Sequence, residues 1–214
     1  MLYYLLALNT RSFKKYLHMK YKNCFTLLFI LIVMNNSYSQ SNLPLSKIPE
    51  APKEISSSSV TARLIQGVGF RYFWATESLT EKDLQYRPSI DAQSSYETLE
   101  HIYSLSLTIN NAASFTPNVR PLKTIPKDFV SLRKETLHHL KSASEKFLKA
   151  KLVDVEKMKI IFQRESDQSS FPIWNLINGP ISDAIYHTGQ IISFRRTSGN
   201  PVAKGVNVFL GVKN

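Results

Sequence analysis

The feature that most constrains this chain is a stretch near its C-terminus, about residues 172–197, that is apolar over a wide arc of a helix. Its apolar side chains recur at helical spacing: Ile173, Trp174, Ile177, Ile181, Ala184, Ile185, Thr188, Ile191 and Ile192. A helix with so wide an apolar arc has to be buried against several partners. Gly199-Asn200-Pro201 ends the stretch, with glycine at the cap and proline just beyond it. The rest of the chain must therefore supply helices that pack around this one.

Pro180 lies inside this stretch and removes one backbone hydrogen bond, so we expect it to kink or start the helix. We also expect this break to free the Leu176 carbonyl and to aim Asp183 and His187 into the interior. Trp174 and Trp74 are expected to belong to the core or to a pocket wall.

Three earlier stretches, at about 59–78, 94–113 and 128–150, also have apolar residues at helical spacing. Ser94 and Glu97 have the spacing of a capping box at the start of the second. Glycines interrupt the first, which close approach of a neighbouring helix would explain. Three prolines between positions 115 and 126 forbid a helix there and allow a long crossover. These features predict an all-α fold, a four-helix bundle with a long crossover between its second and third helices.

Shorter segments complete this prediction. Residues 157–163 are compatible with a short strand or with a loop. Residues 206–210 alternate weakly, which predicts a short extended C-terminal tail.

The first 39 residues have the layout of a secretory signal peptide. Two lysines precede an uncharged apolar run, Cys24–Met34, and small residues follow it at Ser37 and Ser39. The run is too short to cross about 30 Å of hydrocarbon as a helix. Cleavage after Ser39 predicts a periplasmic or secreted protein without a stable membrane span. An uncut anchor is the alternative, and Met19 is a candidate for the true start.

Cysteine usage fits this assignment. Cys24 is the only cysteine and lies inside the predicted signal peptide, so the mature chain can use neither a disulfide nor a cysteine nucleophile. Residues 40–58 are rich in Ser, Pro and Lys and are predicted to be a linker. Residues 59–214 are predicted to be one domain, long enough to bury its own core.

The positive charge is concentrated rather than spread. The formal charge is +11, but five of the basic residues precede position 40, which leaves 22 basic against 16 acidic residues, a net of +6. Residues 120–159 hold 11 basic and 5 acidic residues and so account for this whole excess. A nucleic-acid binder would show a recognition helix or a stacking platform as well. We therefore expect no nucleic-acid partner.

Asp183 and His187 are one helical turn apart and project from one face, a line that Gln190 and Phe194 continue. A carboxylate on so apolar a helix needs a partner, and a divalent cation would accept both side chains as ligands. His101 lies at the edge of the apolar stripe of the second helix. Spacing alone leaves two interpretations open, and it favours ordinary hydrogen-bonded side chains over a metal site.

Other catalytic schemes find little support in the residues. The chain has seven glycines, no glycine-rich phosphate loop and no Gly-x-Ser-x-Gly elbow. His138 and His139 lie in the basic third helix without a partner at helical spacing, so we do not expect them to be ligands. Glu97 and Glu100 are best explained by capping and solvation.

Three segments together resemble the DinB/YfiT-like superfamily of bacterial four-helix bundles, many of which bind metal: Leu79–Pro88, Glu97–Ile102 and Asp183–Gln190. The similarity spans about residues 60–214. The part from Trp174 to Gln190, together with Ser193–Arg196 and Gly199–Pro201, is similar to an exported subgroup.

The resemblance implies a ligand set. The family has one histidine on the second helix and two histidines, four residues apart, on the last. His101 and His187 match two of these positions, whereas Asp183 stands where the family has the third histidine. Aspartate is also a good zinc ligand, and two histidines with one carboxylate are similar to the arrangement of non-haem iron sites. The resemblance therefore implies a divalent metal ion, zinc or nickel, with iron as an alternative.

The function implied is that of a metal-dependent hydrolase or transferase of the cell envelope, acting on a small-molecule substrate. A non-catalytic module that binds small molecules or the envelope is the main alternative, and a structural stress protein with an empty pocket is another. The sequence leaves the substrate, the use of a thiol cosubstrate and the oligomeric state open, with a homodimer as one alternative.

Overall fold

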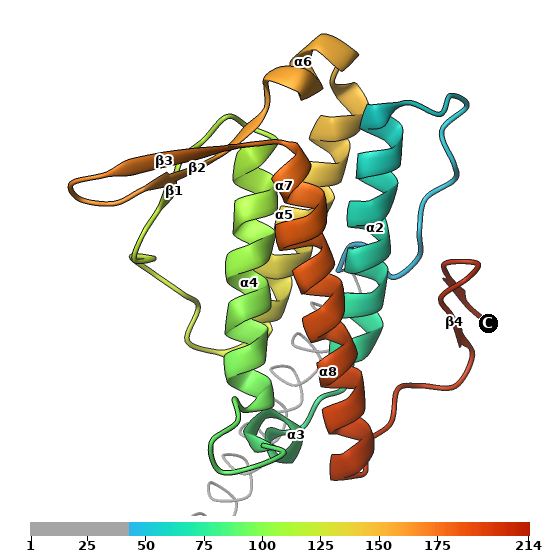
Figure 1. Cartoon of the computed structure of the whole chain (residues 1–214). Coiled ribbons are helices and arrows are strands. Elements are labelled where there is room, and N and C mark those ends of the chain that lie inside the picture. The colour runs from blue at the N-terminus through green and yellow to red at the C-terminus, as the bar shows by residue number, and fades with distance from the viewer. Residues whose placement is uncertain (1–42) are drawn as a thin grey trace, which may run out of the picture. The chain divides into compact units, whose positions relative to one another are not determined.

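Four long helices dominate the part of the chain that the structure, a computed structural model, describes, which is residues 43–214 (Figure 1). They are α2 (Ser57–Thr76), α4 (Ser95–Ala112), α5 (Phe129–Lys149) and α8 (Ser182–Ser198). The predicted signal peptide and its cleavage site lie outside the described residues. The chain is mostly helical, as predicted, but several small strands make the all-α class only partly right.

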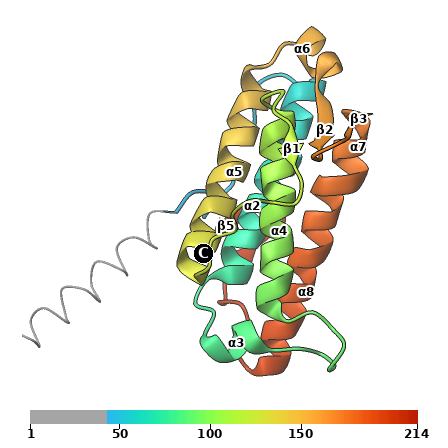
Figure 2. The same ribbon diagram turned by 90° about the vertical axis from the view of Figure 1, so that its left-hand side faces the viewer.

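The long helices pack in pairs around a shared core. α2 contacts α5 and α8, and α4 contacts the same two helices. Figures 1 and 2 show this arrangement from two directions. Each helix contributes fully buried apolar side chains, among them Ile65 and Phe70 from α2, Leu99 and Ile102 from α4, Leu137 and Phe147 from α5, and Ala184 from α8. This packing brings α4 and α8 side by side, which decides where the candidate site forms.

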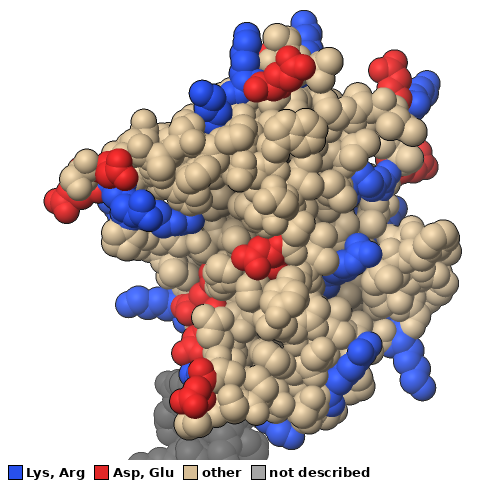
Figure 3. Space-filling view, viewed as in Figure 1, with Lys and Arg blue, Asp and Glu red and all other residues tan. Residues whose placement is uncertain are grey.

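The buried face of α8 is narrower than the sequence predicted. Ala184, Thr188 and Ile191 are buried, but Ile185 is 37% exposed and Trp174 is 74% exposed. The prediction that the whole apolar arc is buried is therefore wrong. The side of the molecule that carries α7 (Trp174–Leu176) and α8 is instead a largely uncharged surface, as Figure 3 shows.

The helix starts follow local rules. Ser94 accepts a hydrogen bond from the Glu97 amide at 3.1 Å, and the Glu97 carboxylate accepts one from the Ser94 amide at 2.8 Å, so the predicted capping box is confirmed. Reciprocal caps also start α2, at Ser56, and the short helix α3 (Glu81–Gln85), at Thr80. Another short helix, α6 (Leu152–Lys157), follows α5.

The expected break at Pro180 is confirmed: the segment η1 (Ile177–Ile181), between α7 and α8, contains a kink. Gly179 has φ −94° and ψ −108° there, outside the helical region. The Ile177 carbonyl accepts hydrogen bonds from both the backbone amide and the hydroxyl of Ser182, the latter at 2.6 Å.

Small strands lie at one end of the long helices. β1 (Asn118–Val119) pairs in parallel with β2 (Lys159–Gln163), which pairs antiparallel with β3 (Gln168–Pro172). β2 matches the segment for which the sequence left a strand or a loop open. β1 belongs to the proline-rich crossover between α4 and α5. A separate two-stranded ribbon, β4 (Val206–Asn207) with β5 (Val212–Lys213), forms the C-terminal tail.

Residues 44–49, assigned above to a linker, contact α2 and this tail. The Ser46 carbonyl accepts from the Trp74 indole at 3.0 Å, and the Ile48 amide donates to the Gly211 carbonyl at 2.8 Å. A Cβ at Gly69 would lie 2.1 Å from Leu45, so this glycine makes room for the leading segment and not for a neighbouring helix. Within residues 43–214, no helix is both long and apolar enough to cross a membrane.

Candidate metal centre

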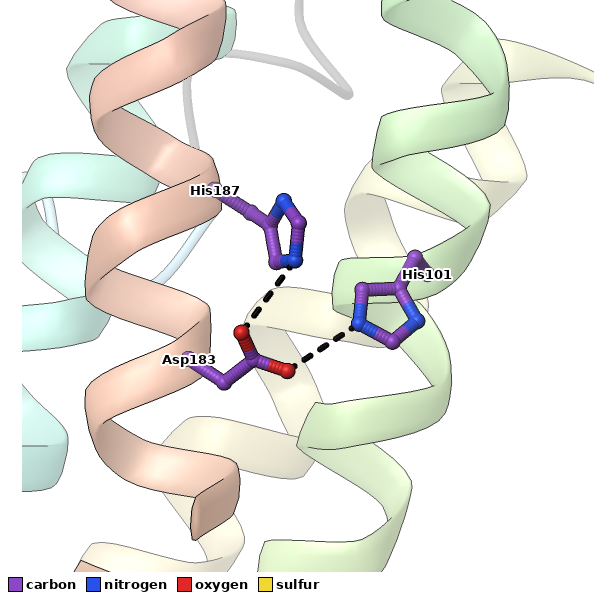
Figure 4. Close-up of side chains that lie close together, drawn as sticks. All are labelled: His101, Asp183 and His187. Atoms are coloured by element: carbon purple, nitrogen blue, oxygen red, sulfur yellow. Dashed lines mark hydrogen bonds and ion pairs between the residues drawn. The ribbon is translucent and has the colours of Figure 1, made fainter. Parts of the chain in front are cut away.

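The contact between α4 and α8 brings His101, Asp183 and His187 together (Figure 4). His101 lies in α4, and the other two lie one turn apart in the first part of α8. Each offers one ligand atom, and these atoms all lie within 4.8 Å of one another. The three residues that the sequence singled out could therefore hold a metal ion.

The Asp183 carboxylate lies between the two imidazole rings and directs one oxygen to each. Its Oδ2 is 3.1 Å from Nε2 of His101, and its Oδ1 is 3.2 Å from Nε2 of His187. The two rings meet edge to face, with centroids 4.6 Å apart. Figure 4 shows both Nε2 atoms directed toward the carboxylate. Two nitrogen ligands and one oxygen ligand thus converge on one small region.

The second ring nitrogen of His187 has a partner on the same helix. Its Nδ1 lies 2.7 Å from Oε1 of Gln190, three residues along. The sequence pattern had placed Gln190 on the line of Asp183 and His187 without assigning it a role. The spacing of three residues was the signal that could have suggested this contact.

The centre lies at the solvent-exposed edge of the contact between α4 and α8, not in its buried part. The side chains of His101 and Asp183 are 40% and 41% exposed, whereas that of His187 is 16% exposed. The expectation that the break at Pro180 aims Asp183 into the interior is wrong, because the carboxylate keeps access to water. Its accessibility also removes the argument that Asp183 must have a partner because it is buried, and leaves room beside the three ligands for another molecule.

A polar network holds the opposite end of α8. This network, the Asp83 cluster, consists of the buried residues Asp83, Arg195 and Ser198 together with Thr80 and Asn200. Asp83 is 1% exposed and accepts from Asn200 Nδ2 at 2.7 Å, from Thr80 Oγ1 at 2.7 Å and from the Ser198 hydroxyl. Burial alone would raise its pKa, but the hydrogen bonds from Asn200, Ser198 and Thr80 outweigh that effect and lower the pKa of Asp83 to about 2. The carboxylate therefore stays charged and fixes α8 against α3.

Arg195 extends this cluster to the end of α2. Its guanidinium donates to the carbonyls of Ala75 at 2.9 Å and Glu77 at 3.0 Å, and also to that of Asn200 at 2.6 Å. Ala75 and Glu77 lie at the C-terminal end of α2, and Asn200 follows the end of α8. Arg195 therefore satisfies the orphan carbonyls at a helix end, a role that sequence reasoning did not find.

The other described histidines lie apart from the centre. His138 is exposed, and its Nδ1 lies 2.7 Å from the Lys134 carbonyl oxygen. His139 lies 3.2 Å from the Ser106 hydroxyl, and its burial lowers its pKa. Neither joins the group of three, in agreement with the sequence analysis. His18 is outside the described residues.

An apolar pocket of about 520 Å³ lies beside α7, apart from the candidate metal centre. It is lined by residues of α2, of α6 and of the segment from β3 to η1, including Val60, Leu152, Trp174 and Ile177. Trp174 therefore forms a pocket wall, one of the two environments predicted for it. None of the three candidate ligands lines this pocket.

Comparison of the chain with protein-family models, with curated proteins and with solved structures finds no significant match.

Proposed function

We propose that this chain binds one divalent metal ion through His101, Asp183 and His187, and that it uses the ion to catalyse hydrolysis or group transfer on a small molecule. The observation that carries this proposal is the convergence of three ligand atoms, from two helices, within 4.8 Å of one another. Both ligand types bind zinc in proteins, and three protein ligands with an open position are typical of catalytic zinc.

A shift of the side chains would bring the three ligand atoms to one metal ion. Ligand atoms held at about 2.0–2.2 Å from one tetrahedral ion lie about 3.4 Å apart. The Nε2 atoms of His101 and His187 lie 3.1 and 3.2 Å from different oxygens of Asp183. One atom from each residue lies within 4.8 Å of the others, so the side chains have to move closer together to share one ion. His101 is the ligand that can adjust, because 40% of its side chain is exposed.

The exposure of the centre supports a catalytic role over a purely structural one. Structural zinc sites are closed by four protein ligands, whereas this group supplies three and leaves its outer side open to solvent. An ion held there supplies Lewis-acid activation of water or of a substrate oxygen. The exposed ring of Tyr186, whose centroid is 5.2 Å from that of His187, is available to contact a substrate on this side.

The wider assignment is part of the same proposal. The pairing of α2 and α4 with α5 and α8, and the long crossover between α4 and α5, support a four-helix bundle of the DinB/YfiT-like type. Zinc or nickel is the proposed ion, with iron as the alternative. The signal-like N-terminus supports action in the periplasm or outside the cell.

Metal content and metal affinity test the proposal. Purified protein is expected to contain close to one equivalent of metal, and the metal-free protein is expected to bind zinc in a competition titration with a chelator. His101→Ala, Asp183→Ala and His187→Ala should each lower the affinity more than tenfold. His138→Ala is the matched control, because this exposed histidine should not change it.

Wild-type affinity in Asp183→Ala would remove Asp183 from the ligand set, and the absence of zinc binding by the wild type would overturn the proposal. Turnover of generic ester or amide substrates by the metal-loaded protein separates an enzyme from a binding module. In an enzyme, turnover should disappear in the three ligand variants and persist in His138→Ala.

A further inference from the structure

We infer that Gln190 is a positioning residue that fixes the tautomer of His187, so that its Nε2 presents a lone pair on the side of Asp183. This inference rests on the proposed metal centre and adds to it the group that decides which ring nitrogen can serve as a ligand. The contact that carries it is the 2.7 Å distance between Nδ1 of His187 and Oε1 of Gln190.

The chemistry of the amide oxygen sets the direction of this hydrogen bond. A carbonyl oxygen only accepts, so Nδ1 of His187 has to donate to it. A neutral imidazole carries one N–H, and with that hydrogen on Nδ1 the other nitrogen, Nε2, has a free lone pair. The ligand-binding nitrogen of a histidine is commonly selected in this way, by the hydrogen bond that the other nitrogen makes.

The consequence appears on the other side of the ring. Nε2 of His187 lies 3.2 Å from Oδ1 of Asp183, so a lone pair and a carboxylate oxygen, both acceptors, face each other. This arrangement is unfavourable by itself, but it suits two ligands that share a cation. If the Gln190 amide nitrogen pointed to Nδ1 instead, Nε2 would carry the hydrogen and would close a hydrogen bond to Asp183. The orientation of the Gln190 amide therefore decides between two states. In one, Nε2 of His187 is free to bind a metal ion, and in the other it donates a hydrogen bond to Asp183.

The two histidines differ in how firmly they are held. His187 is held by Gln190 and is 16% exposed, whereas His101 is 40% exposed. Within residues 43–214, Nδ1 of His101 makes no hydrogen bond of comparable geometry. His187 is thus the pre-organised ligand, and Gln190 is the group whose loss should affect it most.

The wild type and three variants test the inference in the metal-free form and then with zinc alone, and a further variant assigns the NMR signal. Gln190→Met keeps the length of the side chain but removes the acceptor, and Gln190→Glu restores an acceptor. Gln85→Met is the matched control, because the Gln85 amide bonds Glu81 in α3 at 2.6 Å, outside the centre. ¹⁵N NMR of the histidine rings, well above the ordinary pKa of imidazole near 6.5, reports the tautomer, and His187→Ala assigns the signal.

The wild type and Gln190→Glu should show a protonated Nδ1 and an unprotonated Nε2 at His187, and Gln190→Met should lose this preference. Zinc affinity should fall about 10- to 100-fold in Gln190→Met, be recovered in Gln190→Glu and stay unchanged in Gln85→Met. A protonated Nε2 in the wild type would overturn the inference, as would a zinc affinity of Gln190→Met within twofold of wild type. A wild type that binds no zinc would overturn the proposed metal centre, while its His187 tautomer would still decide the role of Gln190.

Discussion

Asp183 lies in the first turn of α8 and Asp83 packs against the last turn of the same helix, and the oxygens of the two carboxylates have different partners. Asp83 is buried and receives hydrogen bonds from three neighbouring side chains that can all donate. Asp183 is 41% exposed and faces two imidazole nitrogens that can act as acceptors. Asp83 has its hydrogen bonds from protein donors, whereas Asp183 remains open to water and to a cation that the two imidazoles could share. The comparison distinguishes a polar cluster that stabilises the fold from a group of side chains that could bind a metal ion.

The largest expected difference between the two carboxylates is in folding stability. Asp83→Ala should lower the free energy of unfolding by about 3–5 kcal/mol, because Ser198, Asn200 and Thr80 lose their acceptor and the buried Arg195 loses a nearby opposite charge. Asp183→Ala in the metal-free protein should change it by less than about 1 kcal/mol, since solvent replaces the lost contacts. Urea unfolding of both variants measures the two values, and equal losses would abolish the distinction between the clusters.

The next largest effect concerns zinc and should appear only at Asp183. Free zinc at 100 times its dissociation constant is expected to stabilise the wild type by about 2.7 kcal/mol, because the ion binds the folded state. Asp183→Ala should lose most of this gain at the same zinc concentration, and Asp183→His should keep it, because imidazole is also a zinc ligand. Thermal unfolding with and without zinc provides the measurement. Stabilisation of Asp183→Ala equal to that of the wild type would mean that Asp183 is not a ligand.

The smallest of the three effects is the acid sensitivity of the Asp83 cluster. The pKa of Asp83 is lowered from 3.8 to about 2 in the folded protein, so its contribution is complete above pH 4 and is lost as the pH falls toward 2. At 1.36 kcal/mol per pKa unit, this loss amounts to about 2 kcal/mol.

The stability difference between the wild type and Asp83→Ala should therefore shrink between pH 5 and pH 2. A carboxyl ¹³C titration of Asp83 in the wild type measures its pKa directly. A midpoint near 3.8 would show that the hydrogen bonds of the cluster do not favour the charged carboxylate.

The features that could be predicted from the sequence are those that depend on neighbouring residues in the chain. The capping box at Ser94, the break at Pro180 and the one-turn spacing of Asp183 and His187 all depend on residues close together in the chain. The approach of His101 to that pair did not follow from spacing, since it depends on which helices are neighbours. It was expected only through the family resemblance, and the packing of α4 against α8 now places the three together.

The parts that sequence reasoning missed depend on tertiary contacts. Arg195 on a helix is expected to be solvated, yet it is 3% exposed because carbonyls of another segment converge on it. The strand β3 has no clear alternation of polar and apolar residues and forms because β2 lies beside it. The space left by Gly69 is filled by Leu45, from a segment whose composition is typical of a linker.

The kinked segment η1 between α7 and α8 makes chain length, as well as residue identity, a determinant of the candidate site. An α-helix turns about 100° per residue, so one residue more or fewer at the kink around Gly179 rotates everything after it by about that angle. Before η1 this helical segment lines the apolar pocket beside α2, and after it the segment presents Asp183 and His187 to α4. We expect a deletion of one residue within 177–181 to turn Asp183 and His187 away from His101. A single insertion or deletion in a gene could thus create or erase the centre while leaving all three of its ligands in the sequence.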